Sequence, residues 1–221
     1  EAAICEVDIL VEDGQGIALA NAVAAGLKTH PPVIFERFGT AHITAGDYAI
    51  EFVSTRTERY ERDSRKPAVA PGTLRDDVMR RDFTVNALLM DWDGTVLDLT
   101  ERGLDDLEHR RLVTPLEPSV TFDEDPLRML RAARFAATLG FDVDPAVAAA
   151  IQRHAQRLQP PTVSMERMRD ELAKLLVADD VLRGLRILDE NRLLVQLLPE
   201  LAPGQGLAHG GWHRPDVFVS G

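Results

Sequence analysis

The pattern of apolar residues changes once along this chain, near Thr114, and that change limits which folds are open to it. Before Thr114, short runs rich in β-branched and aromatic residues lie between turn residues, which is typical of strands. Beyond it, apolar residues recur every three or four positions, which is typical of amphipathic helices. We therefore predict an α+β chain, in which a part mixing strands with a helix precedes an all-helical part.

Turn residues mark the expected elements of the first part. Gly46 and Asp47 favour a hairpin, and a second hairpin is expected at Asp93-Gly94, where ALLMD leads into VLDLT. The charged segment 56–72 contains prolines and a glycine, so we expect a loop there. The remaining elements are expected in this order: strand 7–11, helix 16–27, strand 33–38, strand 40–44 and strand 48–55.

Three helical segments are expected in the second part. In DPLRMLRAARFAATLGF, Pro126 suits the first position of a helix and Gly140 suits its end. VLRGLRILDENRLLVQLL predicts one or two helices that end at Pro199. In SMERMRDELAKLLVA, Ser164 is the expected cap, and the apolar stripe contains Met165, Met168, Leu172 and Leu175.

Composition excludes several classes of protein. The net charge of −11 argues against indiscriminate binding to polyanions. No apolar run reaches the length of a membrane span, and the N-terminus lacks the layout of a signal peptide. The single cysteine, Cys5, cannot form an internal disulfide, which favours a reducing compartment. We expect a cytoplasmic protein that does not bind membranes.

The segment RRDFTVNA places polar side chains directly before an apolar run. Fold stability gives no evident reason for two guanidinium groups, a carboxylate and an amide at the start of a buried element. Guanidinium groups bind phosphates and base edges in a planar, two-point manner. The candidate ligand-binding residues here are Arg80, Arg81, Asp82 and Asn86.

A second polar cluster, EDPLRMLRAARF, allows two interpretations. In the first, Asp125 caps a helix, Arg128 pairs with it one turn later, and Arg131 and Arg134 continue a solvated face. In the second, the Asp125 carboxylate and the Arg128 guanidinium present complementary hydrogen-bonding edges to a nucleobase. The pattern by itself leaves both interpretations open.

Two acids alternate along the first expected strand, Glu6 and Asp8. Alternate residues of a strand share one face, and adjacent carboxylates repel each other unless a cation lies between them. Oxygen-rich pairs of this kind suit Mg²⁺ bound to substrate phosphates, whereas a merely solvated strand face is the alternative. Glu51, which lies among apolar and β-branched residues, is the candidate third acid.

Four segments occur in the order found in the class II tRNA nucleotidyltransferases, and together they resemble that family: RRDFTVNA, GLDDLEHRRL, EDPLRMLRAARF and SMERMRDELAKLL. The family comprises CCA-, CC- and A-adding enzymes and the related bacterial poly(A) polymerases. The resemblance implies a polymerase-β-like nucleotidyltransferase head with a mixed sheet at 1–114. It further implies a helical neck with the nucleotide-recognition helix at 115–178, and a helical body with the start of a tail or HD-type region at 179–221.

The activity implied by the resemblance is template-independent addition of C, A or both, from CTP and ATP, to tRNA 3′ ends, with release of pyrophosphate. Two Mg²⁺ ions would be held by Glu6 and Asp8, with Glu51 as the third catalytic acid. The residues that would hold the ribose and triphosphate are Arg80, Arg81, Asp82 and Asn86.

Base recognition is implied for Asp125 and Arg128, which take the place of a template strand. Arg131 would support them, and Arg134 completes the nucleotide-binding candidates on this helix. The residues expected to orient or brace this group are Glu124, Glu166 and Arg167.

This chain departs from the family in two places. Glu6 stands where the family has an aspartate, so the carboxylate is longer by one methylene although Mg²⁺ demands near-ideal geometry. The Gly-rich turn that the family carries before this pair has no counterpart in the chain, which leads us to expect a fragment or a degenerate member. Near the other end, the candidate metal ligands are His209, His213 and Asp216, and an ordinary loop is the alternative.

Three other functions stay open on the sequence. Besides a tRNA nucleotidyltransferase, the chain could be a catalytically weakened, RNA-binding relative, a poly(A) polymerase acting on general RNA 3′ ends, or a metal-dependent phosphohydrolase. The last is the weakest alternative, because an H…HD…D set of metal ligands is missing from the sequence.

Overall fold

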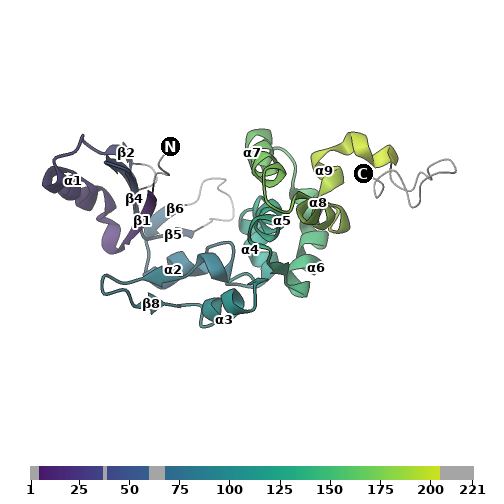
Figure 1. Ribbon diagram of the computed structural model, residues 1–221, viewed down its shortest axis with the longest axis horizontal. Coiled ribbons are helices and arrows are strands. Elements are labelled where there is room, and N and C mark those ends of the chain that lie inside the picture. Colours follow the sequence, from purple (N-terminus) through teal and green to yellow (C-terminus); the bar gives the residue numbers. More distant parts are fainter. Residues whose placement is uncertain (1–4, 37–38, 60–67, 205–221) are drawn as a thin grey trace. The chain divides into compact units, whose positions relative to one another are not determined.

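The computed structural model describes residues 5–36, 39–59 and 68–204, and its ribbon is shown in Figure 1. The chain divides into two compact units, Glu1–Arg80 and Arg81–Gly221. The first contains a mixed sheet and the second is mainly helical, so the predicted α+β class is confirmed. The expected domain boundaries at 114 and 178 stay predictions.

The sheet of the first unit has four strands in the order β1-β4-β3-β2. Strand β1 (Cys5–Val11) runs parallel to β4 (Tyr48–Ser54), whereas β3 (Thr40–Ala45) and β2 (Val33–Phe35) pair antiparallel. The β3–β4 connection is the predicted two-residue hairpin, with Ala45 opposite Tyr48 and Gly46 at φ 61°. The predicted strands and their mixed arrangement are therefore confirmed, although β2 ends at Phe35 and residues 37–38 lie outside the described part.

Helix α1 (Gly16–Leu27) covers one face of this sheet. Its small residues Ala20 and Ala24 are buried against Phe52 and the apolar side chains of β3. The start of α1 approaches β4 very closely, because a Cβ placed on Gly16 would lie 2.7 Å from Ser54 Oγ. The Gly16 amide instead donates to that hydroxyl at 3.0 Å, so a glycine is required at this contact.

The expected loop at 56–72 is wrong for most of its described residues. β5 (Arg56–Arg59) and β6 (Ala68–Pro71) form an antiparallel ribbon, and α2 (Leu74–Met79) follows it. Backbone hydrogen bonds alone build such a ribbon, so its charged composition does not prevent it. Pro71 is tolerated because both strands of a two-stranded ribbon are edge strands.

The second unit begins with a hairpin and ends in packed helices. In chain order its elements are β7 (Leu89–Met90), β8 (Val96–Leu97), α3 (Gly103–Glu108), β9 (Arg111–Leu112), α4 (Pro118–Glu124), α5 (Arg128–Leu139), β10 (Asp142–Val143), α6 (Pro145–His154), α7 (Met165–Leu176), α8 (Val181–Glu190) and α9 (Leu194–Leu197). The β7–β8 hairpin was predicted. Its loop, however, has three residues, because Asp91 and Thr95 close it and Gly94 adopts φ 87°.

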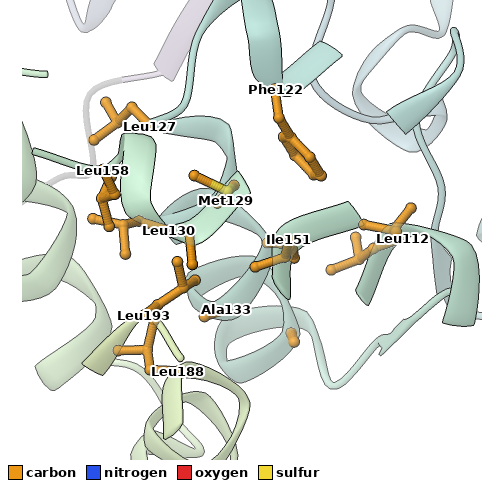
Figure 2. Packing of buried hydrophobic residues seen from close by; sticks show 14 of the residues in the cluster. Leu112, Phe122, Leu127, Met129, Leu130, Ala133, Ile151, Leu158, Leu188 and Leu193 are labelled. Atoms are coloured by element: carbon orange, nitrogen blue, oxygen red, sulfur yellow. The ribbon is translucent and has the colours of Figure 1, made fainter. Parts of the chain in front are cut away.

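Helix α5 lies at the centre of the hydrophobic core, and Figure 2 shows its side chains packed against those of neighbouring elements. Its buried alanines let α8 approach closely, since a Cβ on Gly184 would lie 3.1 Å from Ala137 Cβ. The largest core side chains in this view include Phe122, Met129, Ile151, Leu158, Leu188 and Leu193.

The helical predictions hold in outline and fail at three points. Gly140 ends α5 at φ 68°, and Ser164 caps α7 through the Arg167 amide, as predicted. However, α5 begins at Arg128 rather than at Pro126, because Asp125 accepts the Leu127 amide and forms a tight turn first.

Met165 was predicted in the buried stripe of α7 but is 60% exposed, and it is the first residue of the helix, whereas Met168 is buried. A strand also recurs after Thr114, since β10 pairs with β9 in parallel through two residues only. Such a short pair leaves no alternating pattern to read.

No helix in residues 5–36, 39–59 and 68–204 has the length and apolar character to cross a membrane. His209, His213 and Asp216 lie outside these ranges.

Candidate functional site

The first unit brings the predicted acids onto one face of its sheet. Asp8 on β1 lies directly opposite Glu51 on β4, and Glu6 precedes Asp8 by two positions on the same face. The side chains that follow Asp8 and Glu51 point the other way, since Ile9 and Phe52 pack in the core beneath α1. The acids therefore occupy the face of the sheet opposite α1, where Glu6 and Asp8 are exposed.

Glu51 has a cross-strand partner on this face. His42 on β3 lies opposite it, with His42 Nε2 3.2 Å from Glu51 Oε1. The two side chains are 49% and 37% exposed, so the pair is open to solvent. No local pattern singled out His42, because the register of β3 against β4 is what brings it to Glu51.

The acids fit the chemistry of Mg²⁺, which takes oxygen ligands and commonly binds through one or two carboxylates together with substrate phosphates and water. Among the residues that the structure describes, no group of three His, Cys, Asp or Glu side chains forms a ready-made metal site. Asp8 and Glu51, with Glu6 beside them, would thus supply part of a coordination shell that substrate oxygens complete.

The tandem arginines of RRDFTVNA have different partners. In the first unit, Arg80 donates from Nε to Asp77 Oδ1 at 3.0 Å. In the second unit, Arg81 donates from Nη1 to the carbonyl oxygen of Asn86 at 2.8 Å. Both side chains are therefore held in defined orientations, which reduces the entropy lost when a guanidinium binds an anion.

Asp82 is a buried anchor within the second unit. Its Oδ2 accepts from Arg131 Nε at 2.7 Å, while its Oδ1 accepts from the Phe83 amide at 2.8 Å and from Asn86 Nδ2 at 3.1 Å. Only 6% of the residue is exposed. Asp82 thereby joins the RRDFTVNA segment to helix α5, which residue spacing did not indicate.

A buried acid on α3 holds the same segment from another side. Asp106 Oδ2 accepts from Thr84 Oγ1 at 2.8 Å and from Arg102 Nε at 3.2 Å. Its Oδ1 lies 3.1 Å from Arg111 Nη2, close enough for an ion pair but without a well-aligned hydrogen bond. Two arginines thus compensate a fully buried carboxylate, and the GLDDLEHRRL segment fixes Thr84.

Asp125 and Arg128, at the start of α5, do not pair with each other as the capping interpretation expected. Asp125 Oδ1 accepts the Leu127 amide at 3.1 Å, and its Oδ2 accepts from Arg167 on α7 at 2.7 Å. Arg128 Nη1 donates to Glu124 at 3.0 Å and to the Thr121 carbonyl oxygen at 3.1 Å. The Asp125–Arg128 ion pair is therefore replaced by two separate braces, each from a different element.

Arg131 and Arg134 do not continue a solvated face, so that expectation is wrong. Arg134 Nε lies 2.6 Å from Glu171 Oε2, and its guanidinium carbon is 4.0 Å from the centre of the Phe135 ring. Arg131 also reaches Glu171, at 3.6 Å. Glu171 is 5% exposed and was missed, although its spacing of three from Met168 and four from Leu175 places it on the buried stripe of α7.

Glu171→Gln should lower the free energy of unfolding by about 3 kcal/mol, because it removes one partner of a buried charge network and leaves Arg134 uncompensated. Glu166→Gln on the exposed face of α7 is the matched control and should change stability little. Urea unfolding followed by circular dichroism measures both variants. Equal stabilities for the two variants would show that Glu171 does not hold α7 to α5.

Two family models match most of the chain. Residues 2–113 match the poly A polymerase head domain, and residues 140–204 match a domain described as "Probable RNA and SrmB-binding site of polymerase A". The first match covers the acids of β1 and β4 together with the RRDFTVNA segment. The second begins at the residue that ends α5.

Curated relatives carry the same elements in longer chains. The tRNA nucleotidyltransferase cca2 of Schizosaccharomyces pombe is 40% identical over 202 residues, which is 83% of this chain and 42% of the relative. The A-adding tRNA nucleotidyltransferase of Deinococcus radiodurans is 38% identical over 205 residues, which is 91% of this chain and 43% of that protein. The chain thus spans about two fifths of the length of these relatives.

Solved structures resemble the fold closely. A tRNA nucleotidyltransferase complexed with a primer tRNA and an incoming ATP analog superposes with a TM-score of 0.73 at 28% identity, over 92% of this chain and 55% of that one. The Bacillus stearothermophilus CCA-adding enzyme in complex with CTP gives 0.62 at 35% identity, over 70% of this chain and 36% of that one.

Proposed function

The chain belongs to the family of poly(A) polymerase head-domain proteins that includes the tRNA nucleotidyltransferases, and from this membership we propose that it adds C, A or both to tRNA 3′ ends. CTP and ATP are the proposed donors, and pyrophosphate is the proposed leaving product. The observation that carries the proposal is the register of β1 against β4, which sets Asp8 beside Glu51 on an open sheet face. The relatives and the solved complexes named above support the choice of substrates.

Glu6 and Asp8 are the proposed Mg²⁺ ligands, with Glu51 as the third acid. The metal, when bound, would lower the pKa of the RNA 3′-hydroxyl and neutralise charge that develops on the leaving pyrophosphate. Glu6 keeps the charge of the family's aspartate on a longer side chain. Because a misplacement of about 1 Å can cost roughly 10²-fold in rate, this substitution supports the alternative of a weakened enzyme.

The arginines of RRDFTVNA are proposed to bind the triphosphate, and Asn86 the ribose. Asp82, also proposed to act in nucleotide binding, would do so through its contacts with Asn86 and Arg131. Asp125 and Arg128 are proposed to read the base. Cytosine and adenine both carry an exocyclic amine that a carboxylate can accept from, which is how one acid would serve CTP and ATP alike.

The proposed location is the cytoplasm, and the proposed partner is the 3′ end of tRNA. The match of residues 140–204 to an RNA-binding domain supports RNA contact by the helices beyond α5. The one cysteine of the chain, Cys5, is free, which agrees with a reducing compartment.

One assay tests this function against its alternatives. The full-length protein is incubated with tRNA lacking its 3′ end, Mg²⁺ and labelled CTP or ATP, and we expect extension of the tRNA. Binding without extension would instead support a weakened RNA-binding relative. Equal extension of an unrelated RNA would support a poly(A) polymerase, and nucleotide hydrolysis would support a phosphohydrolase.

A further inference from the structure

Helix α2 is tied to the strands that carry the acids through buried polar contacts. Thr55, which directly follows β4, donates its amide to the carbonyl oxygen of Val11 at the end of β1, at 2.8 Å. Its hydroxyl donates to the Gly72 carbonyl oxygen at 2.7 Å, and the Gly72 amide donates back to Thr55 at 3.3 Å. Thr55 is 1% exposed, so these bonds do not compete with water. The chain segment that enters α2 is thereby fixed to the ends of β1 and β4.

The first turn of α2 is fixed as well. Thr73 accepts from the Asp76 amide at 3.2 Å, and Asp76 accepts from the Thr73 amide at 2.9 Å, which is a complete capping box. Hydrogen bonds from the Thr73 amide and then from its hydroxyl lower the pKa of Asp76. Asp76 is exposed, and these side-chain contacts lie at the start of the helix.

Asp77 has a different environment from its neighbour. It is 2% exposed, lies beside the fully buried Val78, and accepts from both Nε and Nη2 of Arg80 through the same oxygen, Oδ1. A guanidinium carries five N–H donors, and this contact uses two of them. A carboxylate buried to this degree requires a charged partner, so the contact holds the Arg80 side chain in one orientation.

We infer that Asp77 is a positioning residue, which holds Arg80 in place relative to the acid-bearing strands so that its guanidinium binds the triphosphate of the incoming nucleotide. This inference rests on the proposed function for the role of Arg80. The contacts run from β1 and β4 through Thr55 and Gly72 to α2, and from Asp77 to Arg80, all within the first unit. Such a brace lowers the ordering cost when the anion binds.

Asp77→Asn in the full chain should raise KM for CTP and ATP roughly 10-fold or more, with kcat and KM for tRNA little changed. Asp76→Asn is the matched control, because it weakens the start of the same helix but leaves the side-chain contact between Asp77 and Arg80 in place, and it should leave KM for the nucleotides unchanged. In an Arg80→Gln background, Asp77→Asn should add no further increase, since its effect passes through that guanidinium. Asp77→Glu keeps the buried charge but displaces the guanidinium, so it should raise KM for the nucleotides even if Asp77→Asn fails to fold.

Calorimetry with inorganic triphosphate separates this inference from the proposed function. Weaker triphosphate binding by the Asp77 variants than by the wild-type and Asp76→Asn proteins supports the inference, even where no nucleotide is transferred to tRNA. Transfer by the wild-type protein with an unchanged nucleotide KM in the Asp77 variants overturns the inference and leaves the function standing. Equal effects of the Asp76 and Asp77 variants overturn it too, as does a wild-type chain that binds no triphosphate.

Discussion

Asp8→Asn should reduce nucleotide transfer roughly 10³-fold or more, because metal-based charge stabilisation is worth several kcal/mol and about 1.4 kcal/mol corresponds to a factor of ten. Asparagine preserves the shape of the side chain but removes the charge that would hold the cation. Asp8 is exposed on the sheet face opposite α1, so the fold should not depend on it. The initial rate of labelled CTP incorporation into tRNA measures the loss, and thermal unfolding measures stability.

Asp47→Asn provides the same chemical change elsewhere on the sheet. Asp47 is an exposed residue of the β3–β4 hairpin, and its variant should transfer nucleotides like the wild-type protein. Glu6→Asp, which restores the family's spacing of carboxylates, should transfer at least as fast as the wild-type protein. Wild-type rates in the Asp8→Asn variant would remove the metal assignment from this face.

Arg128→Ala should lower discrimination among nucleotides roughly 10- to 100-fold, because unpaired edges of a desolvated base cost about 1–3 kcal/mol each. The Arg128 side chain is 15% exposed and is held by Glu124 and the Thr121 carbonyl oxygen, so it is ordered before any nucleotide binds. Values of kcat/KM for CTP, ATP, UTP and GTP on one RNA primer measure the change.

The alternative role of Arg128 makes a different prediction. If it only pairs with Glu124, its loss should cost a few tenths of a kcal/mol in stability and leave nucleotide preference unchanged. Arg169→Ala is the control, because Arg169 is exposed and pairs with its neighbour Asp170 on α7. Unchanged preference in both variants would reduce Arg128 to a structural residue.

Local sequence signals predicted the elements whose boundaries depend on short-range chemistry. Gly46 and Gly140 occupy left-handed conformations where a hairpin and a helix end require them, and Ser164 caps α7. The ribbon at β5–β6 and the short β9–β10 pair were missed, because two or four residues per strand show no periodicity. The start of α5 was also misplaced, because the Asp125 carboxylate accepts the Leu127 amide and the helix begins two residues after Pro126.

The sequence by itself determined the fold class, the family and the candidate residues, because motif identity and periodicity are written in neighbouring positions. Only the tertiary structure decided which of those residues meet. The register of two parallel strands set Asp8 beside Glu51. Helix packing formed the ion pairs Asp82–Arg131, Asp125–Arg167 and Glu171–Arg134. These partners lie 37 to 49 positions apart in the helical unit, beyond any local pattern. A charge is only neutralised by what lies near it in space, so the role of each buried acid was fixed by packing rather than by spacing.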